Sequence, residues 1–207
     1  MIYWITCFVL RIVVDSLLIF KRHGVENIPE KGSFILVSNH VSHLDPIVAA
    51  VFIRRDISFL GKKGLFKNRF LGWYMRKIRV IPVDKEGSPY GGLKEIIKKI
   101  KEGVPIYIFP EGTRGDGTRF LEPEPGAAFL AVKFDLPVLP VYVQGTDKAL
   151  PKHARRIKRV PVNVYYGKPK RYKMPAGKDK DAAYRHISLM MMEDIGNLKA
   201  GAEGIAA

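Results

Sequence analysis

The chain has 207 residues, which is enough for one compact domain and too few for two independent ones. Apolar residues make up 47% and charged residues 27%, which argues against long disordered segments, and the single cysteine, Cys7, excludes an intramolecular disulfide. The formal net charge of +15 predicts an anionic partner or surface, of which nucleic acid, anionic lipid and an acidic carrier are the main classes.

The first predicted element is an apolar helix over residues 1–20, followed by basic residues at 21–23. A secretory signal matches poorly, because no basic segment precedes the apolar stretch and no small-residue cleavage site follows it. A spanning helix has the necessary length, but it would place Arg11 and Asp15 near the middle of the bilayer, where each costs roughly 2.5–3.5 kcal/mol. Their spacing lets the two charges pair on one helical face. Cys7 has no activating neighbour and is interpreted as a small apolar residue.

This composition favours a helix over residues 1–22 that lies in the membrane interface or is half inserted. Tyr3 and Trp4 would anchor the helix, and Lys21 and Arg22 would lie among the lipid headgroups. The alternative is a core helix of a soluble domain. The favoured interpretation predicts a membrane-associated protein at the cytoplasmic face of the cell membrane.

After this helix, short apolar runs of strand length alternate with helical segments. The expected strands cover residues 33–38, 57–60, 80–83, 106–109, 138–143 and 160–166. The expected helices cover residues 46–53, 65–77, 88–102, 126–134 and 179–198. This alternation predicts a single layered α/β domain over residues 23–199 with a largely parallel or mixed sheet. Residues 200–207 are rich in Gly and Ala and are expected to form a flexible tail.

Reactive side chains gather after two of the predicted strands. Residues 39–45 follow the strand at 33–38, and residues 110–114 follow the strand at 106–109. Ligands of open α/β sheets usually bind beyond the carboxyl ends of the strands, so we expect the two clusters to meet in space.

The first cluster, NHVSHLD, contains a histidine and a carboxylate five positions apart at a junction between a loop and a helix. Asp45 can accept a hydrogen bond from one ring nitrogen of His40, which leaves the other nitrogen to take a proton from a substrate hydroxyl. The plainer interpretation is that Asp45 caps the helix starting at Pro46 and that His40 is an ordinary loop residue.

A metal site is the rival interpretation of the same cluster, with His40, His43 and Asp45 as ligands. A catalytic zinc ion usually has three protein ligands in a fixed geometry, and no second cluster of ligands is visible. The remaining histidines stand alone in the sequence: His23, His153 and His186. We therefore expect no bound metal.

The second cluster, FPEGTR, has the composition of a turn that leaves a strand. Gly112 allows an unusual backbone dihedral or a close approach of a ligand, and Arg114 offers a planar fork that suits a phosphate. Glu111 can position Arg114 or bind a substrate hydroxyl. A plain turn with a solvated Glu–Arg pair is the alternative.

Taken together, NHVSHLD and FPEGTR resemble the two signature blocks of the glycerolipid acyltransferase family, which includes the 1-acylglycerol-3-phosphate acyltransferases. The resemblance extends over residues 24–167. Three further segments contribute to it: 24–29 (GVENIP), 60–66 (LGKKGLF) and 136–141 (LPVLPV).

The resemblance implies an O-acyltransferase without a metal or tightly bound cofactor. His40 would abstract the proton of the free sn-2 hydroxyl of 1-acylglycerol 3-phosphate, and Asp45 would orient His40. The hydroxyl would attack an acyl thioester of coenzyme A or of acyl carrier protein, giving phosphatidate. The alternative is a family member that acts on another lysophospholipid or on glycerol phosphate.

The resemblance also implies how the phosphate is bound. It assigns this role to four residues of the second cluster: Glu111, Gly112, Thr113 and Arg114. Another block of the family usually ends in an arginine that meets the phosphate, and Lys85 occupies that place here. Lysine keeps the charge but lacks the planar fork, so Arg79 is a candidate substitute.

The basic residues between the two blocks are interleaved with aromatic residues over positions 54–77. This mixture suits contact with an anionic membrane surface, and acyl carrier protein is a second candidate anionic partner. The same mixture, together with the basic run KHARRIKR at 152–159, would also suit single-stranded nucleic acid. Charge runs are weak motifs beside two paired signature blocks, so no nucleic-acid partner is expected.

Overall fold

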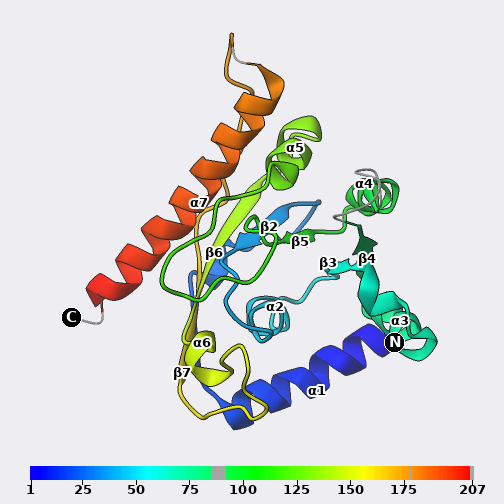
Figure 1. The fold of residues 1–207 in the computed structure, drawn as a ribbon, viewed down its shortest axis with the longest axis vertical. Helices are drawn as coiled ribbons and strands as arrows, with labels where there is room; N and C mark the ends of the chain where they lie inside the picture. Colours follow the sequence, from blue (N-terminus) through cyan, green and yellow to red (C-terminus); the bar gives the residue numbers. More distant parts are fainter. Residues whose placement is uncertain (85–91, 178, 206–207) are drawn as a thin grey trace.

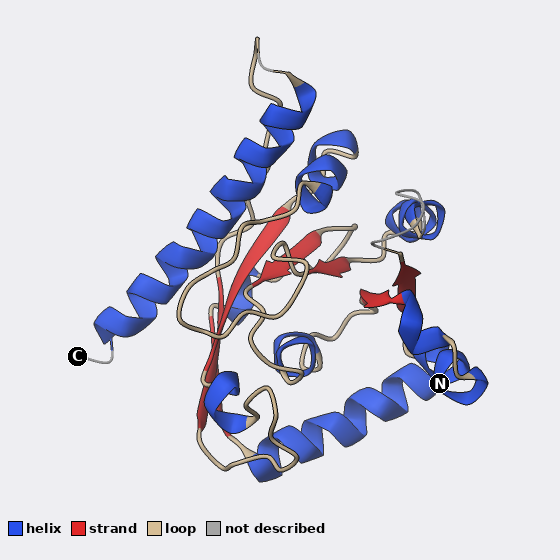
Figure 2. Ribbon diagram, viewed as in Figure 1, coloured by secondary structure: helices blue, strands red, loops and turns tan. Residues whose placement is uncertain are grey.

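The computed structural model describes residues 1–84, 92–177 and 179–205. Within these residues, seven strands form one mixed sheet in the order β1-β7-β6-β2-β5-β3-β4 (Figures 1 and 2). The strands are β1 (Ile19–His23), β2 (Ile35–Ser38), β3 (Ser58–Lys62), β4 (Val80–Val83), β5 (Ile106–Ile108), β6 (Val138–Gln144) and β7 (Pro161–Tyr166). β6 and β7 pair antiparallel, and the other neighbours pair parallel. The predicted α/β class with a mixed sheet is confirmed.

Helices cover both faces of this sheet (Figure 2). The α-helices are α1 (Ile2–Leu17), α2 (Asp45–Ala50), α3 (Arg69–Lys77), α4 (Leu93–Lys101), α5 (Gly126–Lys133), α6 (Thr146–Ala149) and α7 (Lys180–Ile205). Two short 3₁₀ helices, η1 (Val25–Asn27) and η2 (Lys63–Phe66), complete the described helical segments.

The alternation of side chains along the central strand separates two apolar clusters. Ile35 and Val37 pack with residues of α4, α5 and α7 on one face of the sheet. Phe34 and Leu36 pack with residues of α1, α2 and α6 on the other face. Successive strand residues point to opposite faces, so a continuous apolar run such as Phe34–Val37 is expected where both faces are covered.

The N-terminal helix is shorter than predicted. α1 ends at Leu17, and the next residue, Leu18, already has extended backbone dihedrals. Residues 19–23 then form β1, an edge strand paired parallel with β7, so Lys21 and Arg22 belong to the sheet and not to a helix over residues 1–22. Because only Phe20 of this strand is partly buried, its apolar pattern is too weak to mark a strand in the sequence.

α1 packs its inner face on the domain through Tyr3, Cys7 and Val14, which are buried. The spacing of Arg11 and Asp15 would let them pair, but Arg11 instead turns to the domain, where its Nε donates to the carbonyl oxygen of Val51 at 2.7 Å. None of the described helices combines the length and apolar character that crossing a membrane requires.

Two other helices differ from the prediction. The helix expected over 65–77 is divided into η2 and α3, and the Asn68 side chain caps α3 by accepting from Leu71 N–H at 3.0 Å. α7 continues through Ile205, with Ala202 only 2% exposed, so residues 200–205 extend a packed helix and are not a flexible tail. The expected start of the helix at residue 88 lies outside the described residues, and α4 is described from Leu93.

Candidate active site

The two reactive clusters meet at the carboxyl ends of adjacent parallel strands, as the sequence predicts. β2 pairs with β5, and the loops that follow these strands are joined by hydrogen bonds. The backbone N–H of His40 donates to Glu111 Oε1 at 2.8 Å, and the N–H of Gly115 donates to the His40 carbonyl at 2.8 Å.

His40 and Asp45 form the expected pair. His40 Nδ1 lies 2.9 Å from Asp45 Oδ2, and the same oxygen accepts the backbone N–H groups of Val41 and Ser42 at 2.7 Å each. A carboxylate can only accept, so Nδ1 carries the proton and Nε2 is left as the acceptor of a neutral imidazole. Asp45 is the first residue of α2, and Pro46 with its fixed φ suits the first turn, but the helix has no side-chain cap and its N-cap residue is Leu44. The interpretation of Asp45 as a helix cap is therefore wrong, and its carboxylate serves the pairing with His40 instead.

Two further side chains fix this pair, Thr146 from outside the signature blocks and Phe109 from the first position of the second block. Thr146, fully buried at the start of α6, donates its hydroxyl to Asp45 Oδ1 at 2.5 Å. Phe109 stacks on the imidazole of His40, with ring centroids 3.8 Å apart and planes 16° from parallel. The carboxylate and the ring plane are therefore both held, and no local sequence signal indicates either contact.

Glu111 has a different role from the predicted one. Its two carboxylate oxygens accept backbone N–H groups, from His40 at 2.8 Å and from Leu121 at 2.9 Å. Glu111 is 4% exposed and does not line the cavity described below, and burial raises the pKa of this carboxyl. Glu111 thus links the His40 loop to the second cluster, and the prediction that it contacts substrate has no support in this geometry.

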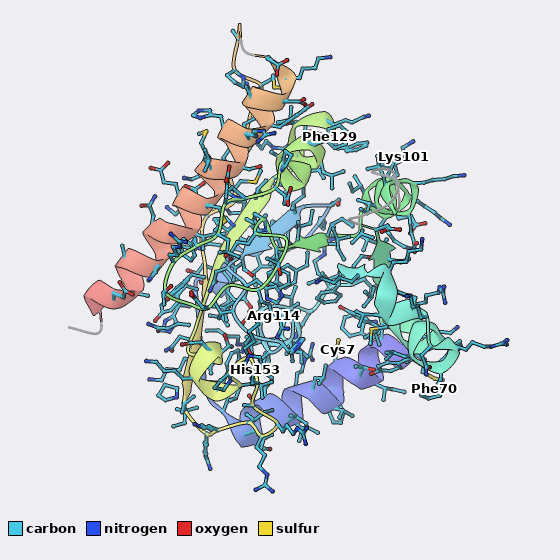
Figure 3. All side chains as sticks on the ribbon, in the orientation of Figure 1. Cys7, Phe70, Lys101, Arg114, Phe129 and His153 are labelled. Carbon is cyan, nitrogen blue, oxygen red and sulfur yellow. The ribbon has the colours of Figure 1, made fainter. Side chains whose placement is uncertain are left out.

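A cavity of about 830 Å³ opens in front of His40. Its polar end is lined by His40, His43, Arg114 and Lys152, together with Gly112 and Thr113. Its apolar walls come from α1, α2, β3 and β4, and include Tyr3, Cys7, Leu10, Ile47, Leu60 and Val83. Arg114, from the loop after β5, and Cys7, from α1, are labelled in Figure 3, and both line this cavity. The cavity thus joins a cationic end to an apolar groove, a combination that suits an amphipathic ligand.

Arg114 is the cation at the polar end that is best placed to bind an anion. The turn before it contains Gly112 with a φ of +63°, a conformation that glycine adopts without strain. Arg114 Nη1 is buried and has no hydrogen-bond partner within the described residues. Burial, followed by the charge of Arg114, lowers the pKa of His43. A buried guanidinium donor without a partner favours an anionic ligand at this position.

Comparison with known proteins identifies the family. The family model described as Acyltransferase matches residues 19–144, more than half of the chain. The chain belongs to the Acyltransferase family. The match includes both signature blocks and strands β1 to β6, whereas α1, Thr146 and Lys152 lie outside it.

Relatives of this acyltransferase-family chain carry related names. It is 34% identical over 131 residues to 1-acyl-sn-glycerol-3-phosphate acyltransferase BAT2, chloroplastic, of Brassica napus, covering 62% of this chain and 38% of the relative. It is 33% identical over 126 residues to the 1-acyl-sn-glycerol-3-phosphate acyltransferase of Bacillus subtilis, covering 60% and 62%. The chain therefore spans less than two thirds of the length of these curated relatives.

A solved structure is similar over most of the fold. The crystal structure of the 1-acyl-sn-glycerophosphate (LPA) acyltransferase PlsC from Thermotoga maritima matches with a TM-score of 0.70 and 28% identity. The match covers 87% of this chain and 71% of that protein.

The cavity does not contain Arg79. Arg79 Nη2 forms an ion pair with Asp56 Oδ2 at 2.7 Å, and its guanidinium lies 4.6 Å from the centroid of the Tyr3 ring. It does not line the cavity and instead holds the N-terminal part of α1. Arg79 is therefore not placed to substitute for the family arginine, and the other candidate, Lys85, lies outside the described residues.

Lys152 supplies a cation that the sequence interpretation missed. It begins the basic run at 152–159, which alone would suit nucleic acid, yet it lines the cavity together with His40 and Arg114. Its segment follows α6 and is remote in sequence from both signature blocks. Only the folded chain therefore places Lys152 at the polar end.

The metal alternative finds no geometric support within the described parts of the chain. His43 lines the cavity and His40 binds Asp45, but no three His, Cys, Asp or Glu side chains in residues 1–84, 92–177 and 179–205 gather as a metal-binding group.

Proposed function

We propose that this chain transfers a fatty acyl group from an acyl thioester to the free sn-2 hydroxyl of 1-acylglycerol 3-phosphate, giving phosphatidate. The observation that supports this most is the His40–Asp45 pair at 2.9 Å beside a cavity with Arg114 at one end and apolar walls beyond. The names of the relatives favour the same acceptor.

His40 acts as the general base. Nε2 takes the proton of the acceptor hydroxyl as its oxygen attacks the thioester carbonyl carbon, forming a C–O bond and a tetrahedral intermediate. The C–S bond then breaks, and the leaving thiolate takes the proton back from the imidazolium. Asp45 holds the ring and stabilises its positive charge. His40 both removes and returns the proton, so the proposal includes no metal or bound cofactor.

Arg114 and Lys152 bind the phosphate of the acceptor. A guanidinium can donate two parallel hydrogen bonds to phosphate oxygens, and the ammonium of Lys152 adds a second positive charge. The apolar walls of the cavity hold a fatty acyl chain. The donor is a thioester of coenzyme A or of acyl carrier protein, and both deliver the same thiol leaving group.

The outer face of α1 rests on the cytoplasmic face of the cell membrane. Apolar side chains cover this face although nothing in the domain packs on it: Trp4, Ile5, Phe8, Val9 and Ile12 are 41–63% exposed. A helix with this composition lies in the interface with its apolar face among the acyl chains. The substrate lipid then lies next to the cavity that α1 borders.

The activity is tested by supplying purified protein with labelled acyl-CoA or acyl carrier protein and a panel of lysolipids. Phosphatidate formed from 1-acylglycerol 3-phosphate is the expected product. His40→Gln should lower kcat by about 10²–10⁴-fold, because a positioned general base contributes roughly that much.

His186→Gln is the matched control, because His186 is exposed on α7, on the opposite face of the sheet from α1 and α2. It should keep full activity. Near-normal turnover by His40→Gln with an unchanged melting temperature would refute the general-base role. A strong preference for a different headgroup would replace the proposed acceptor.

A further inference from the structure

Helix α3 exposes large apolar side chains to solvent. Phe70 is 77% exposed, Trp73 is 46% exposed and Leu71 is 37% exposed. Phe70 and Trp73 are neighbours, with ring centroids 6.0 Å apart, and Figure 3 shows Phe70 pointing away from the domain. Scattered apolar residues are normal on a surface, but adjacent exposed aromatic rings on one short helix indicate an interaction site.

The charges of α3 have a single sign. Its sequence, RFLGWYMRK, contains Arg69, Arg76 and Lys77 and no acidic residue. Lys77 Nζ lies 6.0 Å from the centroid of the Trp73 ring, so a cation accompanies the aromatic patch. Aromatic rings among cations are typical of surfaces that meet anionic lipid headgroups.

The exposed patch of α3 lies next to α1, the helix proposed to contact the membrane. The Tyr74 hydroxyl lies 3.1 Å from Thr6 Oγ1, which fixes α3 beside the N-terminal half of α1 (Figure 1). Residues of both helices line the cavity, among them Met75 of α3 and Leu10 of α1. Both helices therefore border the same cavity, and both also expose apolar side chains to solvent.

We propose that α3 is a second membrane-contact element, which inserts Phe70 and Trp73 into an anionic bilayer beside α1. This inference rests on the membrane placement of α1 in the proposed function. A second copy of the chain is a poorer occupant, because a twofold contact through α3 would bring the cations of both copies together. An anionic lipid surface complements these cations and accepts the aromatic rings.

The two tryptophans of the chain, Trp4 on α1 and Trp73 on α3, let each helix be observed separately. Trp4→Phe leaves Trp73 as the only tryptophan, and Trp73→Phe leaves Trp4. Each variant is mixed with vesicles of phosphatidylcholine and phosphatidylglycerol. The emission of Trp73 should shift to shorter wavelength and be quenched by lipids brominated on the acyl chain.

The outcomes separate the two proposals. A response of Trp4 without a response of Trp73 overturns the role of α3 and leaves that of α1. If neither tryptophan responds, both membrane placements are overturned. A shift of Trp73 emission with protein concentration in the absence of vesicles would identify a second copy as the occupant and also overturn the proposal.

Binding strength gives an independent measurement. The double substitution Phe70→Ser and Trp73→Ser should weaken vesicle partitioning by at least about tenfold, because two aromatic side chains no longer leave water. The matched control is Leu189→Ser with Met190→Ser on α7. These residues are 53% and 40% exposed, but α7 covers the opposite face of the sheet from α1. Equal losses in the two double variants would contradict a specific role of α3.

Discussion

The carboxylate of Asp45 is held by contacts that divide between its two oxygens. Oδ2 accepts from His40 and from two backbone N–H groups, whereas Oδ1 accepts from the Thr146 hydroxyl. Asp45 is fully buried, so the Thr146 hydroxyl takes the place of the water that would otherwise solvate Oδ1. Thr146 is therefore a positioning residue that acts on the imidazole through Asp45.

Replacing Thr146 tests this role. Thr146→Val keeps the shape and removes the hydroxyl, which leaves a buried carboxylate oxygen unpaired at a cost of about 1–3 kcal/mol. If that cost falls on the orientation of His40, kcat should drop by about ten- to a hundredfold while KM for the acceptor changes little. Thr146→Ser should restore kcat. Steady-state kinetics of the unchanged protein and the two variants measures kcat and KM. A Thr146→Ser variant as slow as Thr146→Val would assign Thr146 a packing role only.

At the residue scale, sequence alone finds contacts that are local. His40 and Asp45 lie five positions apart on one turn, so their pairing follows from the sequence. Thr146 and Lys152 reach the site from the segment after β6, and only the strand order places that segment beside β2. The prediction for Arg79 failed for a similar reason, because its partner Asp56 comes from the segment before β3 and holds Arg79 outside the cavity.

At the scale of elements, α1 is part of the domain as well as the proposed membrane contact. Its inner face lines the cavity and carries the Tyr3 hydroxyl, which donates to the Arg55 carbonyl at 3.3 Å and accepts from Ile57 N–H at 3.2 Å. Its outer face carries the exposed Phe8. A simple membrane anchor would not need the inner contacts.

We therefore expect the two faces of α1 to respond differently to substitution. Tyr3→Phe should lower the free energy of unfolding by about 1–3 kcal/mol in buffer without membranes, because a buried N–H loses its acceptor. Phe8→Ser should change it by no more than about 0.5 kcal/mol, because this side chain contacts solvent. Urea denaturation measures both. If Tyr3→Phe has no effect, α1 is not a stabilising part of the isolated domain.

The elements that the sequence predicts best are those with strong apolar patterns. β2, β5 and β6 are continuous apolar runs because both faces of the central sheet are covered. β1 was missed because four of its five residues are exposed and because Ile19 and Phe20 continue the apolar run of α1. The extension of α7 was missed because Gly and Ala suggest fraying, whereas Ala202 packs against the core.

At the scale of the whole molecule, groups of cations lie near both ends of α1. The cations of α3 flank its N-terminal half. The run 152–159 lies near its C-terminal end, because Ile157 packs in the same apolar cluster as Val14 and Leu18. Cations on either side of an apolar helix would add electrostatic attraction to apolar insertion, at about 1 kcal/mol for each cation near an anionic surface.

The cationic run can be tested by reversing charge at two exposed residues, Arg155→Glu and Arg156→Glu. This variant should bind phosphatidylglycerol-containing vesicles more weakly by about 2 kcal/mol or more, and zwitterionic vesicles nearly as before. The matched control reverses Lys94 and Lys101, which are equally exposed but lie on α4, on the opposite face of the sheet from α1. Since both variants have the same net charge, a difference in their vesicle binding shows the effect of where the cations lie. Salt should reduce that difference because the screening length is about 10 Å at 0.1 M. Equal weakening would mean that only the total charge of the molecule attracts it to lipid.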